Sequence, residues 1–379
     1  MKRLRCSQCG TDFREELQRW RCDCGGALDL VFEPDIRGFN RGRDWTIWRY
    51  FDALPIESED DVVTLGEGLT PILPVEIDSC PVLFKQEQIF PTASYKDRGA
   101  AVLVSRMKEL GVTECVEDSS GNAGAAIAAY CARSGIDCRI YVPEHASGGK
   151  LAQISSSGAE IIKIPGSRQD VARAASEGAR TRYYASHCWN PYFLHGTKTF
   201  AFELWEQLDR RVPDALVLPV GHGTLLLGAE LGFRELRRSG LVSRLPRLVA
   251  VQAANCAPLC TDDPAYAPQP TLAEGIAIAA PARGRQIREA VRTSGGRFIA
   301  VEESEIIEAL RMMGRRGFIL EPTAAAAVAG VMRYLREAPA DELVVSAFTG
   351  HGLKTMAKIR DLHRQEPAGN LRSRIRRRT

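Results

Sequence analysis

The sequence contains no uninterrupted apolar run that approaches the length of a membrane-spanning helix. Its basic start, residues 1–5, leads directly into a cysteine pair, whereas a secretory signal would continue into an apolar segment. These two absences predict a cytoplasmic protein that makes no contact with a membrane.

Strong charge of one sign is also missing, because the 379 residues carry a formal net charge of only +3. Such a balance provides no general positive field for nucleic acid, so we expect no nucleic-acid partner. The exception is the end of the chain, residues 366–379, which we interpret as a solvated basic tail, with polyanion binding as the alternative. Its arginines are Arg372, Arg374, Arg376, Arg377 and Arg378.

The familiar nucleotide-binding fingerprints are absent from the glycine-rich segment 218–228, LPVGHGTLLLG, which matches neither the dinucleotide motif nor the P-loop. The segment nevertheless follows an expected strand and opens an expected helix. Its glycines let the backbone close on a phosphate, and a helix N-terminus favours the negative charge. On its own, such a loop is only a weak indication of phosphate binding.

The length and the 45% hydrophobic content suffice for two packed α/β domains and a small extra module. Apolar runs predict strands at 115–117, 138–142, 160–164, 183–185, 215–219, 247–252 and 343–347. Helical patterns lie between them at 102–110, 125–133, 149–157, 171–182, 193–208 and 225–238. Strands that alternate with helices indicate parallel sheets, whose ligand-binding loops lie at the carboxyl ends of the strands.

Eleven cysteines in a chain of this size indicate a reducing compartment rather than a disulfide framework. The first four form two close pairs, each followed by glycine, within a separate module at 1–30. This spacing suits two knuckles that converge on a structural zinc ion, with the ligands Cys6, Cys9, Cys22 and Cys24. Because the second pair is tighter than usual, a ribbon that folds without metal is the alternative.

Lys96 lies in the segment 91–99, PTASYKDRG, immediately before a long helical pattern. The positive end of the helix dipole disfavours a second cation there, which makes the neutral amine more accessible. A lysine held in this way can form a Schiff base with a carbonyl compound. The alternative is a solvent-facing lysine in a helix cap formed by Ser94.

A second polar turn, residues 119–124 (SSGNAG), opens the small-residue helix expected at 125–133. Hydroxyl groups, an amide side chain and backbone N–H groups at a helix start form a suitable site for a carboxylate. The same turn could also serve structure alone.

Taken in order, these segments resemble the threonine synthase family, which belongs to the fold type II pyridoxal-phosphate enzymes related to the tryptophan synthase β-subunit. The resemblance covers the cysteine ribbon, LGEGLTPI at 65–72, the lysine segment, the SSGNAG loop, the glycine loop and FTGHGLK at 348–354. The chain departs from the usual family motifs at Leu69, Phe90, Ala93, Tyr95 and His222.

The resemblance implies a two-domain α/β fold with twisted parallel sheets flanked by helices. The large cofactor-binding domain would comprise 31–97 and 201–365, and the small mobile domain 98–200. It also implies a homodimer that acts on a small amino acid.

The resemblance also implies a role for individual residues of the site. Lys96 would bind pyridoxal 5'-phosphate covalently, Asn122 would lie beside its phenolic oxygen, and the hydroxyl of Thr349 would meet its pyridine nitrogen. The cofactor phosphate would be held by Gly221, His222, Gly223, Thr224 and Leu225. The substrate would contact Ser119, Ser120, the backbone of Ala123 and, unless it merely opens a helix, Asn190. Glu321 would lie near the cofactor ring.

The implied reaction converts O-phospho-L-homoserine and water into L-threonine and phosphate. The departures from the family motifs lie in the segments that line the site, so two other activities stay possible. One is that of a threonine or serine dehydratase, and the other is β-replacement of the cysteate-synthase or cysteine-synthase type. A non-catalytic binding protein is a further alternative. Candidates for contact with a substrate phosphate are Lys150, Arg98 and Lys198.

Overall fold

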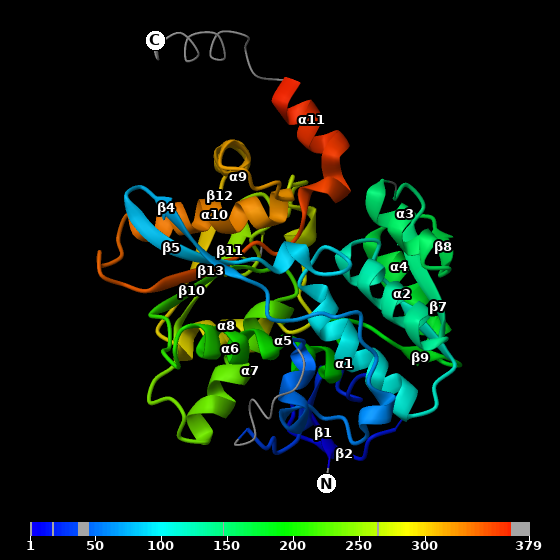
Figure 1. Cartoon of the computed structure of the whole chain (residues 1–379). Helices are drawn as coiled ribbons and strands as arrows, with labels where there is room; N and C mark the ends of the chain where they lie inside the picture. The colour runs from blue at the N-terminus through cyan, green and yellow to red at the C-terminus, as the bar shows by residue number, and fades with distance from the viewer. Residues whose placement is uncertain (1, 17–18, 37–44, 147, 264, 365–379) are drawn as a thin grey trace.

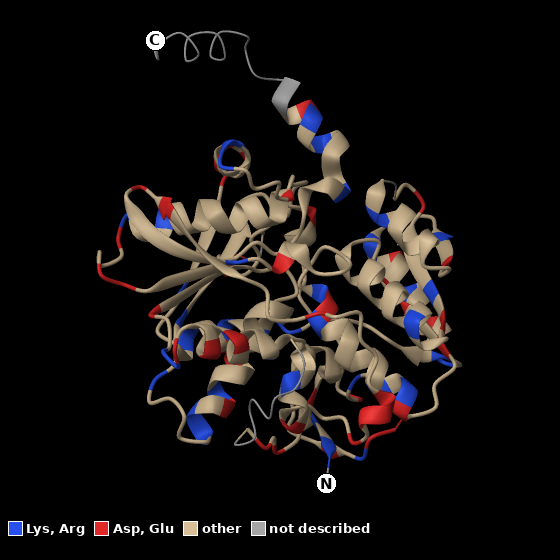
Figure 2. Cartoon of the chain, in the orientation of Figure 1, with Lys and Arg blue, Asp and Glu red and all other residues tan. Residues whose placement is uncertain are grey.

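The computed structural model describes residues 2–16, 19–36, 45–146, 148–263 and 265–364, and contains three sheets (Figure 1). The basic tail predicted at 366–379 lies outside these described residues. Within them, no helix has both the length and the apolar character needed to span a membrane. Lys and Arg are interspersed with Asp and Glu along the outer helices, whereas the central strands are largely uncharged (Figure 2).

The largest sheet has six strands in the order β12-β11-β10-β13-β5-β4. All neighbouring pairs are parallel except β5 and β4, which are antiparallel. The strands are β4 (Ile72–Ile77), β5 (Cys80–Lys85), β10 (Ala215–Pro219), β11 (Arg247–Ala253), β12 (Arg297–Val301) and β13 (Val344–Ala347).

Both faces of this sheet are covered by helices, which explains why β10 is a continuous apolar run. Leu216 and Leu218 pack in one cluster with residues of α6 (Thr199–Gln207), α7 (Thr224–Arg238) and α8 (Gly284–Thr293). Val217 points to the other face, toward α9 (Glu303–Arg315) and α10 (Pro322–Leu335). Figure 1 shows these two helix layers on opposite sides of the sheet.

A second, four-stranded sheet has the order β8-β7-β6-β9 and is entirely parallel. Its strands are β6 (Glu114–Glu117), β7 (Asp137–Pro143), β8 (Glu160–Ile164) and β9 (Tyr183–Tyr184). They alternate with α2 (Asn122–Ser134), α3 (Gly149–Ser156) and α4 (Arg168–Gly178). The predicted parallel pairing is confirmed, while the predicted domain boundaries stay a prediction.

Two helices lie between the sheets, α1 (Lys96–Glu109) and α5 (Pro191–Thr197). The single helix predicted at 193–208 is wrong in detail, because the chain forms α5 and α6 with a break at Lys198. Short 3-10 segments occur at η1 (Ile47–Ala53), η2 (Glu59–Asp61), η3 (Glu87–Ile89), η4 (Glu274–Ile276) and η5 (Gly352–Thr355), and η5 leads into α11 (Met356–Arg364).

The N-terminal ribbon is a small antiparallel sheet of β1 (Arg3–Cys6), β2 (Asp12–Phe13) and β3 (Leu28–Val31). It is fixed to the rest of the molecule by the buried side chain of Arg283. This guanidinium donates to Leu28 O at 2.7 Å, to Asp29 Oδ1 at 2.6 Å and to Cys188 O at 2.9 Å. One arginine thus connects the ribbon to the segment that follows β9.

Candidate active site

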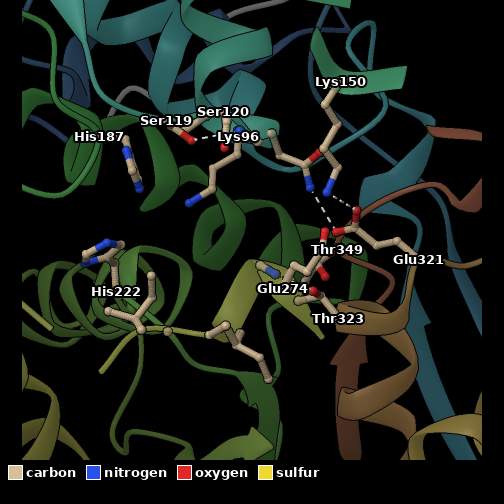
Figure 3. A pocket seen from close by; sticks show the side chains of 18 of the residues that line it. Lys96, Ser119, Ser120, Lys150, His187, His222, Glu274, Glu321, Thr323 and Thr349 are labelled. Atoms are coloured by element: carbon tan, nitrogen blue, oxygen red, sulfur yellow. Dashed lines mark hydrogen bonds and ion pairs between the residues drawn. The ribbon is translucent and has the colours of Figure 1, made fainter. Parts of the chain in front are cut away.

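A cavity of about 530 Å³ lies at the carboxyl ends of strands from both large sheets, as predicted for parallel sheets (Figure 3). Its size is typical of a small-molecule site. The sequence-predicted residues that line it are Lys96, Ser119, Ser120, Asn122, Ala123, Gly221, His222, Gly223, Glu321 and Thr349. Segments more than 200 residues apart in the sequence therefore meet in one place.

Lys96 is the first residue of α1, and its Nζ donates to Thr224 Oγ1 at 3.1 Å. The turn before it is held by Asp97, whose carboxylate accepts from Thr92 N at 2.8 Å, and burial raises the pKa of Asp97 to about 7. The alternative of a surface lysine capped by Ser94 is wrong. The N-cap is Tyr95 without a side-chain hydrogen bond, and the Ser94 hydroxyl is buried.

The glycine loop between β10 and α7 fits a phosphate group. Gly223 has φ +73°, and a Cβ there would lie 2.5 Å from Ile287 Cδ1. At Gly221 a Cβ would lie 2.9 Å from Ile276 Cα, so only glycine fits at either position. The helix begins at Thr224, and the first N–H groups of a helix, including that of Leu225, have no partner within it.

Two buried polar atoms on other walls of the cavity also indicate a bound polar group. Thr349 Oγ1 and Asn122 Oδ1 have no hydrogen-bond partner among the described residues. Buried polar atoms are normally satisfied, so both fit a ligand with complementary groups. Asn122 Nδ2 donates to Glu321 Oε1 at 2.9 Å, and Lys150 Nζ lies 3.3 Å from Glu321 Oε2.

The predicted carboxylate site is the turn at the start of α2. Ser119 Oγ accepts from Gly121 N at 3.2 Å, which shapes the turn, and Ser120 lines the cavity beside it. Since α2 begins at Asn122, the N–H of Ala123 belongs to its first turn, where backbone donors have no helical acceptor.

Three residues predicted near the substrate lie elsewhere. Asn190 does not line the cavity, because its side chain caps α5 by accepting from Tyr192 N at 3.1 Å and also donates to Tyr183 Oη at 2.8 Å. Arg98 is fully buried and pairs with Glu87 and Glu203, both at 2.6 Å. Lys198 pairs with Glu235 at 2.8 Å. Of the basic candidates, Lys150 reaches the cavity.

The sequence reasoning missed His187 and Arg168, which also line the cavity. His187 Nδ1 lies 2.7 Å from Glu117 Oε1, and its ring centroid lies 5.2 Å from that of His222. Burial lowers the pKa of His222 to about 3, with further contributions from Arg168 and Lys96. His187 follows the strand expected at 183–185, so the rule that sites lie at carboxyl ends could have found it.

The four ribbon cysteines lie together, and their sulfur atoms all fall within 4.8 Å of one another. Cys6 Sγ lies 3.5 Å from Cys24 Sγ, and Cys9 Sγ lies 3.6 Å from both Cys22 Sγ and Cys24 Sγ. Tetrahedral zinc with Zn–S bonds of about 2.3 Å requires S···S separations of about 3.8 Å, so the residues fit the metal.

Comparison with known proteins identifies the kind of site that this geometry forms. The family description "Pyridoxal-phosphate dependent enzyme" matches residues 63–350, which include every cavity segment described above. The chain belongs to the pyridoxal-phosphate-dependent enzymes. As a member of this family it is an enzyme with pyridoxal phosphate as its cofactor. The unpartnered hydroxyl of Thr349, the amide oxygen of Asn122 and the glycine loop fit that group.

Curated relatives of this pyridoxal-phosphate-dependent enzyme include threonine synthases. The chain is 35% identical to the threonine synthase of Methanocaldococcus jannaschii, with 92% of each chain covered. It is 33% identical to that of Methanosarcina acetivorans, covering 96% of this chain and 94% of the relative. It is 37% identical to the threonine synthase of Synechocystis sp., covering 80% of this chain and 82% of the relative. The predicted membership of the threonine synthase family is confirmed.

Solved structures of other pyridoxal-phosphate-dependent enzymes share the fold. The O-ureido-L-serine synthase structure superposes with a TM-score of 0.68 at 22% identity, covering 81% of this chain and 96% of that one. Maize serine racemase superposes with a TM-score of 0.64 at 21% identity, covering 78% of this chain and 94% of that one. The predicted fold type II architecture is therefore confirmed.

Proposed function

We propose that this enzyme is a threonine synthase that converts O-phospho-L-homoserine and water into L-threonine and phosphate. The observation that carries the proposal is the position of Lys96 Nζ, which lies in one cavity with the glycine loop at 221–223 and a threonine hydroxyl that has no partner among the described residues. The relatives named threonine synthase support it, because two of them match more than nine-tenths of the chain.

The cofactor, when bound, supplies an electron sink that stabilises negative charge at the substrate's Cα. Gly221, Gly223 and the start of α7 would hold its phosphate, and the Thr349 hydroxyl would meet its ring nitrogen. A hydroxyl does not keep that nitrogen protonated as a carboxylate would, so Thr349 tempers the sink. This setting suits eliminations and replacements.

Lys96 performs the proton transfers in this proposal. Its free Nζ would remove the proton from the substrate's Cα and would then move a proton at Cβ. In the free protein the hydrogen bond from Nζ to Thr224 Oγ1 directs the amine into the cavity.

The substrate's two anionic ends would bind at different walls. Its carboxylate would accept hydrogen bonds from Ser119, Ser120 and the N–H of Ala123. The basic side chain of Arg168, which lies in the lining and faces His187, would hold its phosphate in place of Arg98 and Lys198, which are paired elsewhere. Glu321 joins Lys150 and Asn122 across the cavity, which supports closure of the small sheet over the substrate and exclusion of water.

The finer features of the enzyme belong to the same proposal. One structural zinc ion would be held by Cys6, Cys9, Cys22 and Cys24. The enzyme would act as a homodimer in the cytoplasm, as the family resemblance implies. Sedimentation of the purified protein tests the dimer, and metal analysis tests the zinc.

The function is tested by recording the absorbance spectrum of purified protein before and after addition of O-phospho-L-homoserine, with phosphate and threonine assayed in the same sample. We expect a visible band from lysine-bound cofactor, phosphate release and threonine. Lys96→Ala should lose the band and the activity, while Lys108→Ala, on the exposed side of the same helix, should keep both. A band without phosphate release would favour a dehydratase or a β-replacement enzyme. A band without activity on any amino acid would indicate a binding protein.

A further inference from the structure

Glu117 and His187 form a buried pair of which His187 lines the cavity, and the function proposed above leaves this pair without a role. Glu117 ends β6 and is fully buried, and its Oε1 lies 2.7 Å from His187 Nδ1. Because Nδ1 faces the carboxyl group, Nε2 is the ring nitrogen left for the cavity. An imidazole fixed in this way by a carboxyl group is oriented for proton transfer.

The surroundings of His187 place it opposite Lys96. A ring nitrogen of His187 and one of His222 lie within 4.8 Å, and the two rings meet at 83°. In Figure 3 the amine of Lys96 points toward the space beside these two histidines. The reacting part of a substrate held at Lys96 would therefore lie between the lysine and His187.

The charged neighbours of the pair come from several elements. Lys96 on α1, Arg168 on α4 and His222 before α7 face His187, while Asp118 adjoins Glu117 and accepts from Arg168 through its backbone oxygen at 2.9 Å. Burial, and then Lys96, His222 and Arg168, lower the pKa of His187 well below its usual value. Burial, and then Asp118, raise the pKa of Glu117 well above its usual value.

Both pKa shifts favour the neutral forms in the free cavity, with the carboxyl proton of Glu117 lying between its Oε1 and His187 Nδ1. The entry of a dianionic phosphate beside the imidazole favours a cation there, so the shared proton moves from the carboxyl group to Nδ1. His187 then carries protons on both nitrogens, and Nε2–H can donate into the cavity. The pair is converted from neutral to charged by the arrival of an anion.

We propose that His187, positioned by Glu117, donates the proton that the leaving phosphate takes up. This inference rests on the proposed function. The Cγ–O bond of the substrate breaks, its electron pair leaves with the phosphate oxygen, and that oxygen receives the proton from His187 Nε2. The water whose oxygen later bonds to Cβ returns a proton to Nε2, so the pair is restored after each turnover. Glu117 acts through His187 and is a positioning residue.

The test separates proton transfer at Cα from loss of phosphate. For wild type, His187→Gln and Glu117→Gln, exchange of the substrate's Cα proton in heavy water is followed by NMR alongside phosphate release over a range of pH. The absorbance band of lysine-bound cofactor verifies that each variant is folded and loaded. Glu114→Gln is the matched control, because Glu114 lies on the same strand but pairs with Arg182 at the surface.

We expect His187→Gln to lower phosphate release about 100-fold, in the usual range for a general acid, while Cα exchange changes less than about threefold. Glu117→Gln should shift the basic limb of the phosphate-release profile to lower pH by roughly a unit and leave the profile of Cα exchange in place. Glu114→Gln should match wild type in both.

Equal losses of exchange and release in His187→Gln, or no loss of release, would overturn the assignment of the proton donor. An unshifted basic limb in Glu117→Gln would overturn the positioning role. If the wild-type enzyme exchanges the Cα proton but releases no phosphate, the proposed function itself fails, and the phosphate-directed role of His187 fails with it. The wild-type measurement therefore distinguishes the two failures.

Discussion

Thr349 and Ser346 lie three residues apart around the end of β13 and have opposite hydrogen-bonding states. Thr349 Oγ1 is buried without a partner among the described residues, whereas Ser346 Oγ donates to Val217 O at 2.7 Å. A hydroxyl without a partner contributes nothing to the stability of the free protein, while one that makes a buried hydrogen bond contributes about 1 kcal/mol. The two side chains therefore have separable roles, one for the ligand and one for the fold.

Thr349→Val should leave the free energy of unfolding of the cofactor-free protein unchanged or slightly raised, because it removes an unsatisfied polar group. Cofactor affinity should fall about fivefold to tenfold, which corresponds to the loss of about 1 kcal/mol of hydrogen bonding. Urea unfolding and fluorescence titration with pyridoxal phosphate measure the two quantities. Ser346→Ala, the matched control, should show the reverse: lower stability and unchanged affinity. A Thr349→Val protein that is destabilised as much as Ser346→Ala would refute the distinction.

The residues of the site could be predicted from the sequence where they belong to a recognisable motif. Lys96 and the segments 119–123 and 221–223 line one cavity, and their motifs could indicate this because lysine, glycine and small polar residues mark backbone turns in the sequence. Their individual roles stay a prediction. Arg98 and Lys198 could be named only as candidates, because a basic side chain looks the same in sequence whether it faces a ligand or a buried glutamate, and both face buried glutamates. His187 was missed because its partner Glu117 is 70 residues away.

At the scale of elements, α1 and α6 are joined by a buried cluster of charges around Glu203. Its carboxylate accepts from Arg98 Nη1 at 2.6 Å and from Arg98 Nη2 at 2.7 Å, and lies 2.9 Å from Lys85 Nζ. Burial alone would raise the pKa of Glu203, but Arg98 and Lys85 outweigh it and lower the pKa to about 2. The cluster thus depends on an ionised carboxylate.

The sign of the pH dependence follows from the lowered pKa. The contribution of Glu203 is fully present above the unfolded-state pKa of about 4.3 and is lost as the pH falls toward about 2, and it amounts to about 3 kcal/mol. Glu203→Gln should reduce the free energy of unfolding at pH 7 by about 3–5 kcal/mol, since it leaves buried cations unpaired. It should also flatten the acid side of the stability curve.

Urea titrations at several pH values between 3 and 7 measure this effect. Glu177→Gln, which alters an exposed carboxylate on α4, should retain the wild-type acid slope. A Glu203→Gln protein with the same slope as wild type would contradict the assignment.

Helices and strands whose apolar residues repeat at a regular spacing could be predicted from the sequence, whereas features that depend on tertiary contacts could not. The strand at 215–219 and the helix start near 224 agree with the sequence pattern. The break between α5 and α6 contains neither a proline nor a long loop that would indicate it in the sequence. The region 254–342 received no element prediction, although α9 buries Ile306, Ala309, Leu310 and Met313 at the spacing of a helix, a signal that could have revealed it.

At the scale of the whole molecule, the ribbon is connected to the catalytic part through Arg283. The guanidinium contacts both the ribbon backbone and the backbone of Cys188 and Trp189, next to His187. Loss of the ribbon's structure should therefore disturb the cavity wall as well as the N-terminus.

Metal analysis of the purified protein should give one zinc ion per chain. Removal by a chelator should lower the melting temperature by several degrees, because four thiolates lose the ion that holds them together. It should also reduce activity, through the contact of Arg283 with the segment that carries His187. Readdition of zinc should restore both, and Cys6→Ser should reproduce the loss. A metal-free protein with unchanged melting temperature would show that the ribbon folds without zinc.

The contact of Arg283 also imposes an order on folding during synthesis. Its partners Leu28 and Asp29 lie 255 and 254 residues earlier in the chain. The ribbon strands pair within residues 3–31, but their contact with Arg283 can form only after the chain has been made as far as that residue. The ribbon's contacts with Pro55, Arg106 and Tyr192 can form earlier in synthesis, so the Arg283 contact, which joins the ribbon to the segment beside His187, is the late one of this set.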